Sequence, residues 1–551
     1  MTNPDSRYFK TCRKCGYERN PLQAKVCEIC GAALGGLRVP PIVWIALAAA
    51  LGMAGYQAWR RGMIPGIPSP VVNTPVAPVS VPTPPAASAP ANNPASLPGT
   101  TAPATSTSQP AGFPNLGSLF RSEPTPGAST VTPSAAVGDI SGALSQGERL
   151  LIAESTSPEK VAGTQAMTSQ NWEEAVRQFS AARTPLRSDP ETLIYLNNAR
   201  LGAAPALEIA VVVPIGSSVN PAREILRGVA QMQERHNQNR GNALPLRVWI
   251  GDDGNDPARA QALAQAIVAN PRILAVVGHG TSATSVAAAP IYRQGQKLMI
   301  APTSTSTELA QTQSGSQNFI FRTIPSDQFT GTALARHLLG QNLRQVSVFF
   351  NSQSSYSRSL KDAFTTTLAL EGGQVLQEVD LSQGDPPATN GSSQALVLLT
   401  DAQTFEAAMR VVQINNRRLP IFGGDALYRI DALQQGGAAI NGMVVPIPWH
   451  PQKSGDPQFP RAAQQLWGGD VNWRTALAYD ATLALTQALR QAPNPTSSVQ
   501  LAAALTQSGF GVAGVTGMVS FTPTGERLGK VLLVRVQPGS LSKTGYDFVP
   551  L

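Results

Sequence analysis

Cysteine is nearly absent from this chain of 551 residues. All four cysteines lie between Cys12 and Cys30, so disulfide bonds cannot stabilise the rest of the chain. Charged residues are also scarce, at 14% of the composition, and the net charge of +8 is spread thinly instead of forming basic runs. Because a nucleic-acid groove needs a clustered basic patch, we expect no nucleic-acid partner.

Patterns typical of catalysis are missing as well. The histidines are dispersed and form no cluster with metal-ligand spacing: His236, His279, His337 and His450. Residues 278–283 match the glycine pattern of a dinucleotide-binding turn, but that motif requires an acid about twenty residues later. The residues at 301–304 are Ala, Pro, Thr and Ser. We therefore expect a protein that is not an enzyme, and we interpret His279 as a turn residue.

Two Cys-x-x-Cys pairs stand near the N-terminus. Cys12 and Cys15 form the first pair, Cys27 and Cys30 form the second, and a glycine follows each pair. Four thiolates at this spacing suit a closed tetrahedral Zn²⁺ site, and residues 1–36 resemble a short zinc ribbon. A redox pair is the alternative. Because a closed site has no open coordination position, we expect the zinc to be structural and the ribbon to be a possible docking site for a cytoplasmic protein.

An uncharged apolar segment follows the cysteines. Residues 42–59 contain no charge, with Pro40 and Pro41 before them and Arg60 and Arg61 after them. A helix of this length spans about 27 Å, which is just enough to cross a bilayer. We therefore predict a transmembrane helix over residues 40–60. Since thiols favour a reducing compartment, the predicted topology is a single pass through the inner or plasma membrane, with a cytoplasmic N-terminus and a periplasmic or extracytoplasmic large domain.

Residues 62–138 are rich in Pro, Ser, Thr and Ala. Arg121 and Glu123 are the only charged residues between positions 65 and 133. Such a composition cannot bury a core, so we predict a disordered, partly polyproline linker. The linker would let the domain that follows it work well away from the membrane.

Residues 140–205 have helical spacing. Trp172, Ala175, Val176 and Phe179 fall at i, i+3, i+4 and i+7, and Asp189 with Pro190 predicts the start of another helix. This pattern resembles one tetratricopeptide unit. A single unit cannot bury its own apolar face, so we expect the segment to pack on the following domain or to cap it. Peptide binding is the alternative.

From residue 206 to the C-terminus, short apolar strands alternate with helical stretches. Repeated alternation of this kind predicts parallel sheets covered by helices on both faces. At about 345 residues, the region is long enough for two lobes. The expected strands are 209–213, 246–250, 273–277, 298–301, 346–350, 395–399 and 420–422, and the expected helices include 222–233 and 257–269, the second with Asp256 as N-cap and Pro257 at its first position.

The stretch from Ile273 to Gln294 is the most informative. A buried strand ends at Gly278, and Thr281 or Ser282 then caps a helix that begins near Ala283. This arrangement places backbone N–H groups and hydroxyls at the carboxyl end of a parallel sheet. Open α/β sheets bind ligands at that end, and helix N-termini there favour anions. A plain helix cap without a ligand is the alternative.

The region 206–551 resembles the leucine/isoleucine/valine-binding proteins of bacteria, a type 1 periplasmic substrate-binding family. The resemblance is carried by seven segments in family order: 252–258, 276–278, 288–292, 300–304, 321–327, 479–481 and 514–521. It implies two Rossmann-like lobes that close on a ligand about a hinge. The implied first lobe covers about 207–325 and 447–522, the second about 326–446 and 523–551, with crossovers near Pro325, Pro446 and Pro523.

The resemblance also implies a site for an amino acid. The family residues that hold the α-carboxylate match Ser282, Thr303 and Thr305, which are physically apt because hydroxyls at helix N-termini satisfy anions. Thr305 with Glu308 also fits a capping box. The acid that takes the ammonium matches Asp425, for which a solvated loop acid is the alternative.

A tyrosine that covers the site in the family matches Tyr356. Where the family has an aromatic residue against the ligand side chain, this chain has Asn220 or Pro221. We therefore expect the binding frame for α-amino acids to be kept and branched-chain specificity to be lost.

The function implied is a membrane-anchored, extracytoplasmic solute-binding protein for amino acid transport or sensing, with an ABC permease as the possible partner. Two alternatives stay open. The first is a small amide or urea as ligand. The second is a scaffold without transport, since a cell-wall synthase activator in some bacteria joins tetratricopeptide-like helices to a domain of this fold.

Overall fold

The computed structural model describes residues 9–10, 20–21, 142–311, 317–492, 495–527 and 529–551. Near the N-terminus, β1 (Phe9–Lys10) pairs antiparallel with β2 (Asn20–Pro21). The four cysteines, the predicted transmembrane helix at 40–60 and the predicted linker at 62–138 lie outside these residues. Within the described ranges, no helix is both long enough and apolar enough to cross a bilayer.

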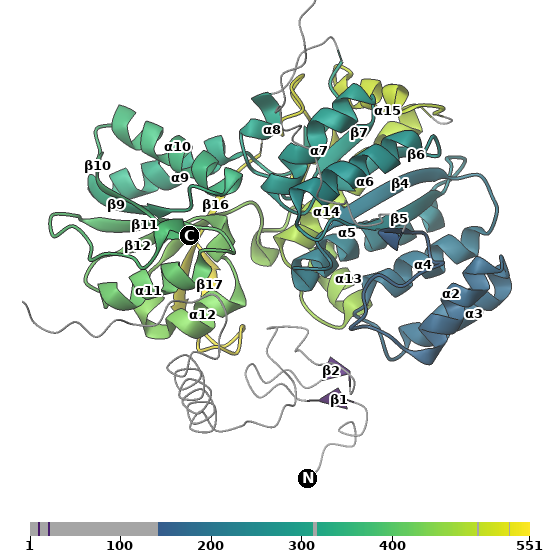
Figure 1. Ribbon diagram of the computed structural model, residues 1–551, viewed down its shortest axis with the longest axis horizontal. Helices are drawn as coiled ribbons and strands as arrows, with labels where there is room; N and C mark the ends of the chain where they lie inside the picture. The colour runs from purple at the N-terminus through teal and green to yellow at the C-terminus, as the bar shows by residue number, and fades with distance from the viewer. Residues whose placement is uncertain (1–8, 11–19, 22–141, 312–316, 493–494, 528) are drawn as a thin grey trace, which may run out of the picture. The chain divides into compact units, whose positions relative to one another are not determined.

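The first lobe is built on a six-stranded sheet in the order β3-β5-β4-β6-β7-β8 (Figure 1). Neighbouring strands from β5 to β8 are parallel, whereas β3 pairs antiparallel with β5. All four strands predicted for this lobe are confirmed. The bounds are β3 Leu144–Ser145, β4 Leu207–Val213, β5 Leu246–Asp252, β6 Ile273–Gly278, β7 Leu298–Ala301 and β8 Ile320–Arg322.

Helices cover both faces of this sheet. Ile209 and Val211 of β4 pack in one apolar cluster with α5 and α14, whereas Ala210 and Val212 pack in another with α6 and α7. The helices of this lobe are α5 Val219–Asn239, α6 Pro257–Ala269, α7 Ser282–Gln294, α8 Glu308–Gln311, α13 Gln458–Trp467, α14 Trp473–Gln491 and α15 Ser498–Thr506, and β14 (Val512–Gly514) pairs with β15 (Gly517–Val519). The predicted start of α6 is confirmed, because the Asp256 side chain accepts the N–H of Arg259 and Pro257 opens the helix.

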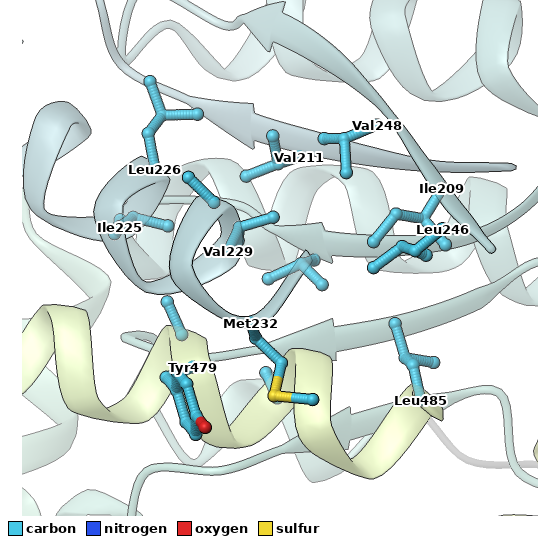
Figure 2. Close-up of a cluster of buried hydrophobic side chains, with 14 of the residues drawn as sticks. Ile209, Val211, Ile225, Leu226, Val229, Met232, Leu246, Val248, Tyr479 and Leu485 are labelled. Carbon is cyan, nitrogen blue, oxygen red and sulfur yellow. The ribbon is translucent and has the colours of Figure 1, made fainter. Parts of the chain in front are cut away.

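The contact between α5 and α14 fixes the core of the first lobe. Figure 2 shows Met232 of α5 beside Tyr479 and Leu485 of α14, with Val211 of β4 above them. A Cβ atom at Gly228 would lie 2.2 Å from the carbonyl oxygen of Thr475, so only glycine permits this approach of the two helices. The position of α14 relative to the sheet is therefore set by backbone packing.

The helical segment before β4 belongs to the first lobe. Its helices are α2 Pro158–Thr168, α3 Trp172–Arg183 and α4 Pro190–Leu201, and their apolar side chains join the cluster that contains α5 and α14. The side-chain amide of Asn198 donates to the carbonyl of Val248 at 2.7 Å and accepts its N–H at 3.0 Å, so it extends the ladder of β5. The segment packs on the domain that follows, as expected, while its likeness to a tetratricopeptide unit stays a prediction.

The second lobe is built on a seven-stranded sheet in the order β10-β9-β11-β12-β13-β16-β17. The strands are β9 Gln345–Phe350, β10 Gln374–Asp380, β11 Ala395–Leu399, β12 Ile421–Gly423, β13 Val444–Ile447, β16 Leu532–Pro538 and β17 Tyr546–Pro550. Neighbours from β10 to β13 are parallel, and β16 and β17 are antiparallel to their neighbours. The helices are α9 Asp327–Gly340, α10 Ser355–Leu370, α11 Phe405–Asn415 and α12 Ile430–Gly436, with short 3₁₀ turns η3 Leu381–Gln383, η4 Asp425–Leu427 and η5 Gly437–Ile440, and a further turn, η6 Pro451–Lys453, follows the crossing after β13. The predicted α/β fold of two lobes is confirmed.

The chain passes between the sheets at three places, after β8, after β13 and between β15 and β16. Arg322, at the end of β8, is buried at the first crossing. Its guanidinium donates to the carbonyls of Ser304 and Ser306 and forms an ion pair with Glu526 at 2.5 Å. This arginine therefore ties the loop after β7 to the third crossing.

Candidate ligand-binding site

The first part of the site is the N-terminus of α7, at the carboxyl end of β6. Thr281 is the N-cap, and its side chain accepts the N–H of Thr284. Ser282 is buried in the first helical turn, and its hydroxyl accepts the N–H of Ser306 at 3.3 Å. The first N–H groups of a helix have no partner within the helix, so this end of α7 can bind an anion. The hydroxyl of Ser282 already holds the loop after β7 in place.

Thr303, in the loop after β7, is also buried and already hydrogen-bonded. Its hydroxyl donates to the carbonyl of Gly280 at 3.0 Å and lies 3.4 Å from the carbonyl of His279. In this arrangement Thr303 offers a ligand its backbone N–H rather than its hydroxyl hydrogen. Ser282 and Thr303, two of the three residues predicted to hold a carboxylate, thus use their hydroxyls for contacts within the protein.

Thr305 differs from its two neighbours. It is 2% exposed, and among the described residues its hydroxyl forms no hydrogen bond of good geometry, although it lies close enough to the buried carboxylate of Asp327 to lower the pKa of that acid. The prediction that Thr305 and Glu308 form a capping box is wrong, because α8 begins at Glu308 and the side chain of Ser306 accepts the Glu308 N–H at 3.3 Å.

Asp425 and Tyr356 meet in the second lobe. Asp425 opens η4 directly after β12 and is 6% exposed, while Tyr356 lies in the first turn of α10. The tyrosine hydroxyl donates to Asp425 Oδ1 at 2.6 Å and accepts the N–H of Ala426 at 3.3 Å. A Cβ atom at Gly424 would lie 2.6 Å from the tyrosine hydroxyl, so glycine is required for this contact. The alternative of a solvated loop acid at Asp425 is wrong.

The electrostatics of this pair favour a cationic ligand group. Burial raises the pKa of Asp425, against the hydrogen bond from Tyr356 and the positive charge of Arg474, which lower it. Burial, with the charge of Asp425, raises the pKa of Tyr356 well above its ordinary value, so the tyrosine remains a hydrogen-bond donor at neutral pH. A buried carboxylate in such surroundings gains most from an ammonium group brought by a ligand.

Asp327, at the start of α9, is a site residue that the sequence did not reveal. It is fully buried, and neither oxygen of its carboxylate forms a hydrogen bond of good geometry among the described residues, although the nearby hydroxyls of Ser359 and Thr305 lower its pKa. Burial raises the pKa of Asp327 to about 7, and the charge of Asp425 contributes in the same direction. An acid at the first position of a helix is usually explained by its favourable interaction with the helix dipole, so the sequence alone did not single out Asp327.

A small hollow lies where the chain crosses between the lobes. Thr305 lines it from the first lobe, and Thr330 and Asp425 line it from the second. The remaining lining residues come from the crossings and the strands beside them: Ile324, Pro325, Pro446, Ile447, Pro448 and Val531. The enclosed space is only about that of one water molecule, so a solute could enter only if the lobes separate.

The lobes also touch beside this hollow. The N–H of Thr307 donates to the hydroxyl of Ser359 at 2.9 Å, and Arg358 forms an ion pair with Glu308 at 3.2 Å. These contacts join the loop after β7 and α8 to α10. The structure therefore brings Thr305, Asp425 and Tyr356 to one region, with Ser282 and Thr303 supporting the loop that carries Thr305.

Arg474 is a second residue that the sequence did not reveal. It lies in the first turn of α14 and is half-buried, with its guanidinium 4.2 Å from the ring centroid of Trp473. Burial lowers the pKa of Arg474, and the carboxylate of Asp425 is the largest charge that opposes this shift. The arginine thus lies near Asp425, although no ion pair within 4 Å joins it to a described residue.

Two further predictions concern positions beside the site. His279, interpreted as a turn residue, lies in the connection between β6 and α7 and is fully buried, with Nδ1 2.8 Å from Asp253 and Nε2 3.2 Å from the hydroxyl of Tyr292. Asn220 and Pro221, expected in a loop, lie in the first turn of α5 and are half-buried. Local sequence does not predict the burial of His279 or the start of α5, because both depend on tertiary packing.

Comparison with known proteins agrees with this architecture. Residues 206–541 match the family model described as periplasmic binding protein. The leucine-, isoleucine-, valine-, threonine-, and alanine-binding protein of Pseudomonas aeruginosa is 29% identical over 185 residues, which cover 33% of this chain and 48% of that protein. The Leu/Ile/Val-binding protein of Escherichia coli K12 is 33% identical over 124 residues, or 22% of this chain and 32% of that protein. The chain thus matches half or less of the length of these two relatives.

Solved structures extend the likeness across the fold. The leucine binding protein of Thermotoga maritima has a TM-score of 0.54 at 22% identity, covering 62% of this chain and 97% of that one. A substrate-binding protein of an ABC transporter from Desulfitobacterium hafniense, in complex with leucine, has a TM-score of 0.52 at 22% identity, covering 63% of this chain and all of that one. These relatives are binding proteins rather than enzymes. Through residues 206–541, the chain belongs to the periplasmic binding protein family.

Proposed function

We propose that the chain captures an amino acid between its two lobes and presents it to an ABC-type permease or to a signalling partner. The observation that carries this proposal is that a carboxylate and a hydroxyl from different lobes line the same hollow. Asp425 supplies a buried carboxylate from the second lobe, and Thr305 supplies a buried hydroxyl from the first. A ligand that carries both an ammonium and a carboxylate satisfies both groups.

In this proposal each lobe binds one end of the ligand. The N-terminus of α7, the loop at 303–305 and the hydroxyl of Thr305 meet the α-carboxylate. Asp425 meets the ammonium, with Tyr356 holding the orientation of its carboxylate and Asp327 adding negative charge nearby. Because the two sets of groups belong to different lobes, the ligand stabilises the arrangement in which the lobes approach each other.

Ligand screening tests the proposal. The full-length chain, purified in mild detergent because of the predicted membrane helix, is heated with each of the twenty amino acids, with small amides and with urea. A ligand at a concentration of 100 times its Kd stabilises the folded state by about 2.7 kcal/mol, which raises the melting temperature measurably. We expect at least one amino acid to do so, with binding then measured by calorimetry.

A scaffold without a ligand is the second candidate function. The observation that favours it is that the hydroxyls of Ser282 and Thr303 already have partners within the protein. If no amino acid, amide or urea raises the melting temperature, this second candidate replaces the first. If only an amide or urea does so, the chain binds a solute without an ammonium group, and the role proposed for Asp425 is wrong.

We also propose that a membrane anchor and a zinc ribbon precede the domain. Residues 40–60 support the anchor by their length and lack of charge, and the pairs Cys12/Cys15 and Cys27/Cys30 support a structural zinc. Reporter fusions before Pro40 and after Arg61 should give a cytoplasmic and an extracytoplasmic signal, and the reverse pattern would refute the topology. Metal analysis of the purified chain should give one zinc per chain, lost when all four cysteines are replaced by serine.

A further inference from the structure

The position of Arg474 is not explained by the stability of its helix. It occupies the first turn of α14, where Asn472 is the N-cap and accepts the N–H of Arg474 at 2.9 Å. The N-terminal end of a helix carries partial positive charge, so a cation in this turn is unfavourable. A role outside the helix is therefore needed to account for it.

The acids nearest to Arg474 are already engaged with other groups. Glu224 of α5 accepts the hydroxyl of Thr475 at 2.5 Å and the N–H of Asn472 at 3.3 Å, and it pairs with Arg227. Asp425, on the opposite lobe, accepts the hydroxyl of Tyr356. Neither acid forms an ion pair within 4 Å with Arg474, which keeps only its contact with the ring of Trp473 among the described residues.

The first turns of α14 adjoin the hollow between the lobes. The hydroxyl of Thr323 donates to the carbonyl of Leu477 at 3.0 Å, which fixes α14 against the end of β8. The next two residues along the chain, Ile324 and Pro325, line the hollow together with Asp425. A half-buried guanidinium without an acidic partner thus stands on the first lobe beside the site and opposite Asp425.

We propose that Arg474 binds a second anionic group on the ligand, so that the amino acid captured is an acidic one such as glutamate or aspartate. This inference rests on the proposed function. Asp425 and the loop at 303–305 account for the ammonium and the α-carboxylate, and they leave Arg474 without a partner. A guanidinium matches a carboxylate with two parallel N–H···O bonds, which an amide or an apolar side chain cannot provide.

A branched-chain amino acid fits this arrangement poorly. Its side chain would cover Arg474 with apolar atoms and leave a buried charge unpaired, which opposes binding. A side-chain carboxylate instead completes an alternating set of charges: Asp425, ammonium, ligand carboxylate, Arg474. Arg474 would then select among amino acids, while Asp425 and Thr305 would bind the ammonium and the α-carboxylate that all amino acids share.

Calorimetry on the full-length chain tests this inference with glutamate, aspartate, glutamine and leucine. We expect the two acidic amino acids to bind the parent more tightly than the two neutral ones. Arg474→Met should weaken glutamate or aspartate on the order of 10- to 100-fold and leave leucine equal or tighter, whereas Arg474→Lys should retain part of the preference. Arg429→Met is the matched control, because Arg429 is a nearby arginine already paired with Asp431 at 2.5 Å, and it should change the preference little.

The outcomes separate this inference from the proposed function. If leucine or glutamine binds the parent more tightly than both acids, or if Arg474→Met weakens all four amino acids equally, the assignment of Arg474 is overturned while amino acid binding stands. If none of the twenty amino acids binds, the proposed function fails and the inference fails with it. Melting temperatures within a few degrees of the parent show that each variant is folded.

Discussion

The hydroxyl of Tyr356 lies 2.6 Å from Asp425 Oδ1, so a tyrosine from α10 holds a buried carboxylate that follows β12. The two residues are far apart in the sequence and become neighbours only because β9, β11 and β12 are adjacent in the sheet. Burial raises the pKa of Asp425 and this contact opposes that rise, so it favours the charged carboxylate that an ammonium group needs.

Replacement of Tyr356 by phenylalanine should therefore change how binding depends on pH. The hydrogen bond from Tyr356 lowers the pKa of Asp425 against the effect of burial, so its loss raises that pKa further and keeps the carboxylate protonated to higher pH. We expect the rise of affinity with pH to begin at higher pH in Tyr356→Phe than in the parent, measured by calorimetry from pH 5 to 8. An identical pH profile would show that the contact does not control Asp425.

Thr305→Val should separate binding from stability. The valine keeps the shape of threonine and removes a buried hydroxyl that has no partner, so the free energy of unfolding should stay equal or rise. Ligand affinity should fall by roughly tenfold, because a hydrogen bond to a charged group is lost. Thr303→Val is the matched control: it removes a hydroxyl bonded to Gly280 and should lower stability. If Thr305→Val is the destabilised variant, the hydroxyl has a partner within the protein.

Asp327→Asn should stabilise the ligand-free protein at high pH. The folded pKa of Asp327 is about 7, above its ordinary value of 3.8, so the unfolded chain releases this proton at lower pH than the folded chain does. Its contribution is therefore most favourable below pH 4, falls as the pH rises toward 7 and then levels off. The variant should match the parent at pH 4 and exceed it at pH 8 by at most about 4 kcal/mol in urea unfolding.

Asp380→Asn provides the control of opposite sign. Burial of this carboxylate is outweighed by hydrogen bonds from Ser352 and Ser382, which hold the pKa of Asp380 below its ordinary value. Its loss should therefore lower stability at neutral pH and matter little in strong acid. If Asp327→Asn also lowers stability at pH 8, the carboxylate of Asp327 is paired and is not a free group beside the site.

The buried ion cluster of the helical segment should be essential for stability. Lys160 lies 2.7 Å from Asp189 and 2.7 Å from Glu191, and all three side chains are buried. Lys160→Met leaves two buried carboxylates unpaired and should cost roughly 3–5 kcal/mol in urea unfolding. Arg177→Met, which breaks an exposed pair with Glu174 on α3, should have little effect. Equal effects of the two substitutions would show that the segment is not part of the folded core.

The central strands could be predicted from the sequence because parallel strands covered on both faces are continuous apolar runs. β4 and β11 are buried along their whole lengths, and both were predicted. The strands that were not predicted include those at the sheet edges. β10 is an outer strand, and none of its residues is fully buried, so Gln374, Gln377 and Glu378 interrupt the apolar pattern. β17, at the other edge, follows β16 as an antiparallel addition after the βα alternation has ended.

The candidate site could be predicted only in part, for a different physical reason. Ser282, Thr303, Thr305, Tyr356 and Asp425 follow strands or open helices at the carboxyl ends of the two sheets, which local patterns and the family resemblance indicate. Whether a hydroxyl has a partner, or an acid is buried without one, depends on contacts between segments that are distant in the chain. Thr305, Asp327 and Arg474 are distinguished by missing partners, and no local pattern encodes a missing partner.

Calorimetry of Asp425→Asn with an amino acid found by the screen tests the central claim most directly. The amide keeps the shape of the carboxylate and removes its charge, so affinity should fall on the order of 10- to 100-fold if Asp425 binds the ammonium. Asp362→Asn, which removes an acid on α10 whose side chain is 71% exposed, should bind like the parent. If Asp425→Asn and Asp362→Asn both bind with the parental affinity, Asp425 does not contact the ligand and the proposed site is wrong.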